Sequence, residues 1–150
     1  MHLNLNLKYF HVLLIFLQVI INRAQEPRRD ETYPPPAVIK SFQIIHDTCV
    51  EKTGVEEASI KAFSVGEIHE DPALKCYMNC FFHEVGIVDD NGEVHYEKFK
   101  RFVPAEIKDI VQHIIEGCEA HVPVGATQCE RAWSWHVCWK EIDPRHYFLV

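Results

Sequence analysis

Residues 71–85 read DPALKCYMNCFFHEV, and this stretch decides the fold class. Asp71 followed by Pro72 is typical of a helix start, with an N-cap residue and then a proline at the first helical position. Within this helix Cys76 and Cys80 are four residues apart, so both project from the same side. Each is well placed to be tied to a different neighbouring element. Apolar residues at helical spacing complete the segment, namely Leu74, Tyr77, Met78, Phe81, Phe82 and Val85.

Helical patterning continues on both sides of this stretch. Thr127 followed by Glu130 matches a capping box and predicts the start of the last helix. No alternating strand pattern of useful length is present. The predicted fold is therefore all-α, with about six helices. The other helical segments run from just after Pro36 to Gly54, over roughly 56–64, over 96–102, from Pro104 to Cys118, and from Thr127 to about Asp143.

The beginning of the chain predicts secretion. Residues 1–24 contain an early cation, a short apolar run (YFHVLLIFLQVII, 9–21) and a small residue, Ala24, which is the pattern of a signal peptide. A transmembrane span would need about 20 apolar residues, so stable membrane insertion is not expected. The predicted mature domain is 25–150, and its first part, 25–36, is charged and proline-rich and is expected to form an extended arm.

Charge and cysteine content restrict the class of protein further. Residues 25–150 carry 13 Lys and Arg against 22 Asp and Glu, a formal net charge of −9, which disfavours nucleic acid as a partner. All six cysteines lie in this part, and an even number after a signal peptide predicts three disulfides. Six cysteines allow fifteen pairings. A Cys76–Cys80 pair is unfavourable within one helix, which leaves twelve.

No catalytic or metal-binding motif is found. The sequence lacks a G-x-S-x-G elbow, an H-E-x-x-H pair and a glycine-rich phosphate loop, so no enzyme activity and no cofactor are predicted. Cys76-x3-Cys80-x2-His83 resembles a zinc spacing, but oxidised thiols cannot ligate metal. A calcium loop around Gly92 fails because Ile87 and Lys98 would occupy its first and twelfth positions. The turn Asp89-Asp90-Asn91-Gly92 is the simpler interpretation.

The end of the chain is unusually apolar. Residues 143–150 read DPRHYFLV, and four apolar or aromatic residues are costly to leave in water, so this tail is expected to fold back against the helices. His46 and the hydroxyl of Tyr77 could then bond the terminal carboxylate of Val150, although His46 at a helix flank could equally face water. Such a contact predicts pH sensitivity.

The cysteine spacing, x26, x3, x37, x10 and x8, resembles that of insect odorant-binding proteins, the pheromone/general odorant-binding family. Several stretches also look like its dipteran antennal members: YPPP (33–36), EIHED (67–71), LKCYMNC (74–80), VDDNG (88–92) and DPRHYFLV (143–150). This resemblance implies the pairs Cys49–Cys80, Cys76–Cys129 and Cys118–Cys138, and six helices around an apolar pocket.

The resemblance also implies a site. The tail would close the pocket as a lid, with Val150 bonded to His46 and Tyr77. Gln112, Ser134 and Trp135 depart from the family pattern, so the resemblance does not identify the ligand. Tyr77 is included among the candidate ligand-binding residues, and the positions that match the family's pocket are Phe99, Ile107, Val111, Ile114, His136, Trp139 and Phe148.

The function implied is that of a secreted carrier in sensillum lymph. It would bind small hydrophobic odorants or pheromones, transport them to olfactory receptors and release them in a pH-sensitive manner. The expected partner is a small hydrophobic ligand, with an olfactory receptor and a second copy of the chain as further candidates. The alternative is a secreted disulfide-rich interaction or signalling protein with a filled core.

Overall fold

The structure, a computed structural model, describes residues 9–18 and 26–150, apart from the side chain of Phe102. Within this part the secondary structure is helical, and the only β contacts are two isolated bridges, Asp30 with Tyr33 and Val88 with Val94. The predicted all-α class is confirmed. Residues 9–18, inside the predicted signal peptide, are helical, and the cleavage site expected after Ala24 lies outside the described residues.

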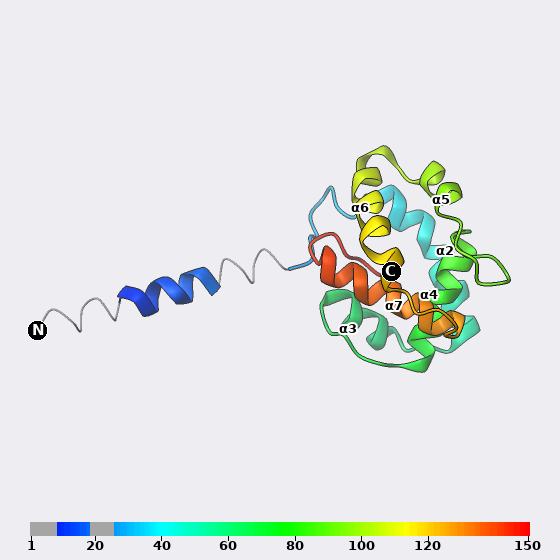
Figure 1. Cartoon of the computed structure of the whole chain (residues 1–150), viewed down its shortest axis with the longest axis horizontal. Helices are drawn as coiled ribbons and strands as arrows, with labels where there is room; N and C mark the ends of the chain where they lie inside the picture. Colours follow the sequence, from blue (N-terminus) through cyan, green and yellow to red (C-terminus); the bar gives the residue numbers. More distant parts are fainter. Residues whose placement is uncertain (1–8, 19–25) are drawn as a thin grey trace, which may run out of the picture.

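Six α-helices follow one another after residue 26 (Figure 1). Two short 3-10 turns, Ala105–Ile107 and Glu119–His121, flank α6. Pro104 therefore precedes a 3-10 turn, where the sequence predicted an α-helix. The reason is the backbone of Ile107 (φ −118°, ψ 6°), which interrupts regular helix. The α-helices are α2 (Pro36–Thr53), α3 (Glu57–Val65), α4 (Pro72–Glu84), α5 (Tyr96–Phe102), α6 (Lys108–Cys118) and α7 (Gln128–Ile142).

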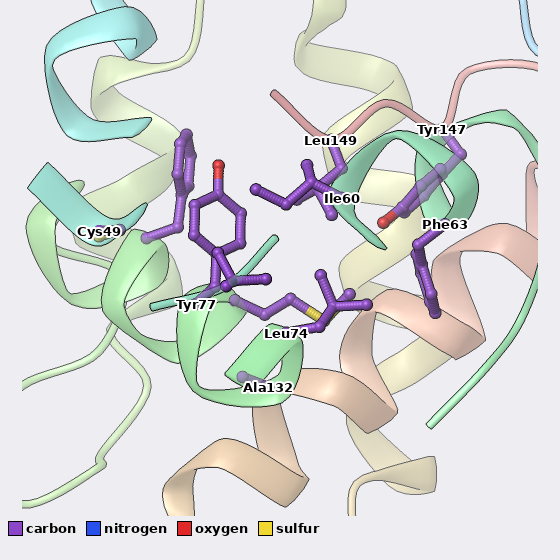
Figure 2. Close-up of a cluster of buried hydrophobic side chains, with 11 residues drawn as sticks. Cys49, Ile60, Phe63, Leu74, Tyr77, Ala132, Tyr147 and Leu149 are labelled. Atoms are coloured by element: carbon purple, nitrogen blue, oxygen red, sulfur yellow. The ribbon is translucent and has the colours of Figure 1, made fainter. Parts of the chain in front are cut away.

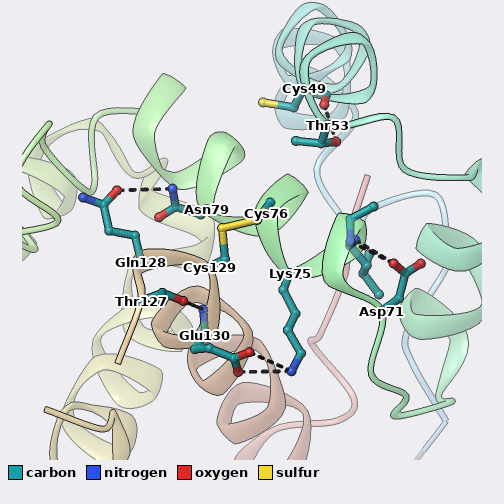
Figure 3. Close-up of a disulfide and its surroundings, with 12 residues drawn as sticks. Cys49, Thr53, Asp71, Lys75, Cys76, Asn79, Thr127, Gln128, Cys129 and Glu130 are labelled. Atoms are coloured by element: carbon teal, nitrogen blue, oxygen red, sulfur yellow. Dashed lines mark hydrogen bonds and ion pairs between the residues drawn. A yellow bond between two sulfur atoms is a disulfide. The ribbon is translucent and has the colours of Figure 1, made fainter. Parts of the chain in front are cut away.

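The helix ends follow the local signals of the sequence. The carboxylate of Asp71 accepts hydrogen bonds from the backbone N–H groups of Ala73 and Leu74, as an N-cap does. Thr127 caps α7 through its hydroxyl, which accepts from the N–H of Glu130. The reciprocal half of the predicted capping box is not seen. The Glu130 carboxylate instead accepts from Lys75 at 3.1 Å (Figure 3), because a charge-assisted bond is stronger than a neutral one.

Three disulfides connect the helices. Cys49–Cys80 joins α2 to α4, Cys76–Cys129 joins α4 to α7, and Cys118–Cys138 joins the end of α6 to α7. These are the pairs that the family resemblance implies. Cys76 and Cys80 leave α4 towards different helices, and Figure 3 shows the bond from Cys76 to Cys129 beside the Lys75–Glu130 ion pair.

A solid core lies between α2, α3, α4 and the tail (Figure 2). The apolar stripe of α4 supplies its centre, and Phe63 of α3 and Tyr147 of the tail complete it. Leu74, Tyr77 and Met78 have no exposed surface. Burial of such side chains contributes roughly 1.5–3 kcal/mol each relative to an exposed position, so this cluster is a main source of stability.

Residues 26–35 pack against the tail, 143–150. Residues 26–35 contain a turn in which the Asp30 carboxylate accepts from the N–H groups of Thr32 and Tyr33. The N–H of Arg28 donates to the carbonyl of Arg145 at 2.6 Å. The segment predicted as an extended arm is thus non-helical and docked on the tail. Its last residue, Pro36, belongs to α2.

Candidate ligand-binding cavity

A cavity of about 210 Å³ adjoins the solid core, with which it shares Phe81 and Leu149. α2, α4, α5, α6, α7 and the tail all contribute to its wall. The wall is almost wholly apolar, with Phe81, Phe82 and Val85 from the end of α4 and Ile110 and Val111 from α6. Apolar walls with few polar groups are typical of sites for small ligands.

A second cavity of about 100 Å³ adjoins the first. It lies towards the segment 87–96 and is lined by Val88, Val94 and Tyr96 together with Ile114, Ile115 and Trp135. Both cavities are bounded by the same five side chains, Phe82, Ile87, Phe99, Val111 and Trp139. The two spaces are therefore neighbours separated only by side chains, and an elongated apolar molecule could use both.

The tail forms part of the wall of the larger cavity. Phe148, Leu149 and Val150 all line it. Leu149 is fixed by two bonds to Ser64 of α3, since its N–H donates to the hydroxyl at 3.2 Å and its carbonyl accepts from the same hydroxyl at 2.9 Å. From the opposite side, the hydroxyl of Tyr33 donates to the carbonyl of His146. In the structure, residues 143–150 fold back against the helices, as the apolar sequence of the tail predicts.

The terminal residue is held by Tyr77. The Tyr77 hydroxyl donates to an oxygen of Val150, and His46 Nδ1 lies 2.8 Å from that hydroxyl. His46 Nε2 lies 2.9 Å from a carboxylate oxygen of Glu57. Among the described contacts, His46 therefore reaches Val150 only through Tyr77. The resemblance implied a direct bond, and the geometry differs because the Tyr77 hydroxyl lies between the two groups.

A second tyrosine–histidine pair lies deeper in the wall. The hydroxyl of Tyr147 is 2.9 Å from Nδ1 of His136, and both side chains are buried. Burial lowers the pKa of His136 to about 3, and the nearby charge of Lys140 acts in the same direction. Burial likewise raises the pKa of Tyr147 well above its ordinary value. His136 is therefore neutral at any physiological pH.

Six of the candidate ligand-binding residues line the larger cavity, namely Phe99, Ile107, Val111, His136, Trp139 and Phe148. Ile114 lines only the smaller one. Tyr77 lines neither and lies in the solid core, where its hydroxyl bonds Val150. The apolar stripe of α4 explains why Tyr77 does not line a cavity. Its first two turns face the core, and only the later residues Phe81, Phe82 and Val85 reach the larger cavity.

Several lining residues were not predicted. Tyr33 and Val38 come from the arm and the start of α2, and Val103 and Pro104 from the link between α5 and α6. Phe81 and Phe82 were recognised as parts of an apolar stripe but not as cavity residues, and Phe42 of α2 also lines the cavity. A stripe at helical spacing shows that a face is buried and does not show whether it meets side chains or a cavity. The sequence around Tyr33 has no pattern that would predict a place in the cavity wall.

The titratable side chains in this wall are those of His136 and Tyr33. Across 9–18 and 26–150, no cluster of three or more His, Cys, Asp or Glu could hold a metal ion. No helix in the same segments is long and apolar enough to cross a membrane.

Comparison with known proteins yields a consistent set of matches. Residues 34–142 match the PBP/GOBP family. General odorant-binding protein 69a of Drosophila melanogaster is 24% identical over 138 residues, which cover 91% of this chain and 88% of that protein. Among solved structures, an odorant-binding protein of the medfly is 27% identical with a TM-score of 0.60 and covers 69% of this chain and 89% of its own. An odorant-binding protein of Locusta migratoria is 28% identical with a TM-score of 0.64, covering 71% and 82%.

Proposed function

The chain belongs to the PBP/GOBP family of odorant-binding proteins, and from this premise we propose that it is a carrier of small hydrophobic molecules that binds them between α4, α5, α6 and α7. The family consists of binding proteins and not of enzymes. The observation that carries the proposal is the apolar cavity of about 210 Å³, whose wall includes Phe148, Leu149 and Val150. The alternative of a filled core finds no support in such a wall.

Titration with an apolar fluorescent probe, N-phenyl-1-naphthylamine, tests this proposal. The protein should give a saturable signal that small apolar compounds displace. Val111→Asp would place an unpaired charge in the wall shared by both cavities, so we expect at least a tenfold loss of probe affinity. Val124→Asp is the matched control, since Val124 is fully exposed and the same charge there should change nothing. Unchanged binding in a folded Val111→Asp protein would contradict the proposal.

A finer part of the proposal concerns where the carrier acts. Disulfides form and persist in oxidising compartments, so the three disulfides support a secreted protein. We propose that residues 1–24 are removed as a signal peptide and that the mature protein carries odorants or pheromones through sensillum lymph to olfactory receptors. Mass spectrometry of protein purified from sensillum lymph would test both points, through the mass of its N-terminal peptide and any ligand that co-purifies.

We also propose that acid favours release through the tail. While the tail is closed, His136 stays neutral behind Tyr147, with Lys140 nearby and Arg29 of the arm facing the same tyrosine. Opening the tail would admit water, and His136 would then take up a proton near its ordinary pKa of about 6.5. The open state therefore gains about 1.4 kcal/mol per pH unit below 6.5 relative to the closed state.

Affinity for the same probe at pH 7 and pH 5 tests this release. The full chain should bind more weakly at pH 5. A protein ending at His146 should bind more weakly at pH 7 and respond less to pH. Full-length His136→Gln keeps a hydrogen-bond acceptor for Tyr147 but cannot be charged, so its affinity should hardly change between the two values. If His136→Gln retains the whole pH response, His136 is not the group that acid acts on.

A further inference from the structure

Two nitrogen atoms in the cavity wall have no hydrogen-bond partner. They are Nε2 of His136 and Nε1 of Trp139, and both are buried. Most buried polar groups in proteins are hydrogen-bonded, because an unpaired one loses its bond to water without compensation. Both side chains line the larger cavity and lie three residues apart on α7, which places them on one face of the helix. Their ring centroids are 6.3 Å apart.

Both nitrogens are donors. An indole Nε1 always carries a hydrogen. For His136 the tautomer follows from Tyr147, whose buried hydroxyl must donate its proton and has His136 Nδ1 as its described partner at 2.9 Å. Nδ1 is then the acceptor of a neutral imidazole, so the hydrogen is on Nε2. The wall thus contains two N–H groups that have no hydrogen-bond partner among the described residues and that belong to side chains lining the cavity.

The rest of the wall restricts the ligand further. No Lys or Arg lines the larger cavity, whereas the Val150 terminus does. A carboxylate ligand would meet no Lys or Arg in this wall. A pure hydrocarbon would leave both N–H groups unpaired. The hydroxyl of Ser41 is engaged with the carbonyls of Ala37 and Val38, so it does not compete as a donor.

We propose that the cavity selects neutral carbonyl compounds, such as ketones, aldehydes and esters, whose oxygen accepts a hydrogen bond from Trp139 Nε1 with His136 Nε2 as a second donor. A carbonyl oxygen has two lone pairs in one plane, so it can accept from one or both donors. Trp139 also borders the smaller apolar cavity, which would take the alkyl part of the molecule. The inference rests on the proposed carrier function and specifies its ligand class.

Competition against N-phenyl-1-naphthylamine at pH 7 gives the first test. Three compounds with the same number of carbons differ only in the group of interest: 2-octanone, octane and octanoate. We expect 2-octanone to bind roughly 3–10-fold more tightly than octane, as one hydrogen bond to an otherwise unpaired donor predicts. Octanoate should bind more weakly than 2-octanone. Octanoate binding as tightly as 2-octanone would overturn the exclusion of anions.

A pair of variants assigns the effect to Trp139. Trp139→Phe keeps an aromatic wall and removes the indole N–H, so the preference for 2-octanone over octane should fall to within about twofold. Trp133→Phe is the matched control. Its indole N–H donates to the carbonyl of His69 at 3.3 Å, and Trp133 is not among the lining residues of either cavity, so this change should leave the preference intact.

NMR of the unaltered protein gives a test that does not depend on a variant folding. The indole N–H resonance of Trp139 should shift downfield with 2-octanone and not with octane, and the His136 ring nitrogens should show hydrogen on Nε2. Equal affinities for 2-octanone and octane, with probe binding preserved, would overturn this inference and leave the carrier function standing. Absence of probe binding altogether would instead overturn the carrier function.

Discussion

The region packed against α2 and α3 and the region around α5 and α6 are built from similar residues and packed differently. In the region against α2 and α3, the side chains of Phe63, Leu74 and Met78 have no exposed surface and fill the space between helices. In the region around α5 and α6, Phe99 and Val111 are also apolar but remain only partly buried, because they face the cavities. Composition alone does not distinguish the two regions.

Because of this difference in packing, one region can stabilise the fold while the other binds a ligand. Two of the three disulfides, Cys49–Cys80 and Cys76–Cys129, connect α4 to the helices around it. Each stabilises the folded state by a few kcal/mol, because it closes a loop and so restricts the unfolded chain. The region against α2 and α3 adds the burial of its core. The region around α5 and α6 therefore does not need to be densely packed for the protein to fold. The tail contacts both regions, since Tyr147 lies in the core and Phe148 in the cavity wall.

The difference in packing can be measured by shortening one side chain in each region and comparing the free energies of unfolding. Leu74→Ala should lower the free energy of unfolding by about 2–5 kcal/mol, because it opens a new cavity in the filled core. Val111→Ala should cost about 1 kcal/mol, since it only enlarges an existing cavity. Urea denaturation at pH 7 gives both values. Equal losses would show that the two regions are packed alike.

A further effect on stability is expected from pH. Burial holds the pKa of His136 near 3 in the folded state, whereas in the unfolded chain it is near 6.5. The unfolded chain therefore binds one more proton between these values, and stability is lost as pH falls from 6.5 towards 3, by up to about 1.4 kcal/mol per unit. Above 6.5 this group has no effect.

The difference between the wild type and His136→Gln isolates this contribution, because acidic groups elsewhere titrate alike in both proteins. Urea denaturation at several values between pH 6.5 and 4 should show a shallower fall for the variant. Parallel curves would mean that His136 is not kept neutral by burial.

The helices could be predicted from the sequence because their signals are local. Asp71–Pro72 and Thr127 begin helices through their own side chains and backbone, and the apolar spacing of 107–118 marks a buried face whatever lies opposite. The disulfide pairs, by contrast, came from the family resemblance, since spacing left twelve arrangements open.

The cavity was harder to predict because it depends on contacts distant in sequence. Ile107 and Ile114 lie on one stripe, yet they face different cavities. Tyr77 belongs to the same stripe as Phe81, yet it bonds the terminus from within the core. Glu130 fits a capping box, yet it pairs with Lys75 across the interface of α4 and α7. In each case a neighbouring element decides between two arrangements that the local sequence permits.

The smallest predicted effect concerns Tyr33, which joins the arm to the tail. Its ring packs against His146 and Phe148 at centroid distances of 5.1 and 5.9 Å, and its hydroxyl donates to the carbonyl of His146. Tyr33→Phe keeps the ring and removes one hydrogen bond, so it should cost about 1 kcal/mol or less. The loss should act on the tail first, because the bond holds the tail and not the core.

Amide hydrogen exchange of Leu149, whose N–H donates to Ser64, reports this local opening. We expect it to accelerate by up to about fivefold in Tyr33→Phe, the factor that corresponds to 1 kcal/mol. Amides in the middle of α4 should change less. Tyr96→Phe is the matched control, since Tyr96 lines the smaller cavity and its hydroxyl makes no hydrogen bond among the described residues. Equal exchange of Leu149 in both variants would mean that the arm does not hold the tail closed, and that Ser64 and Tyr77 suffice.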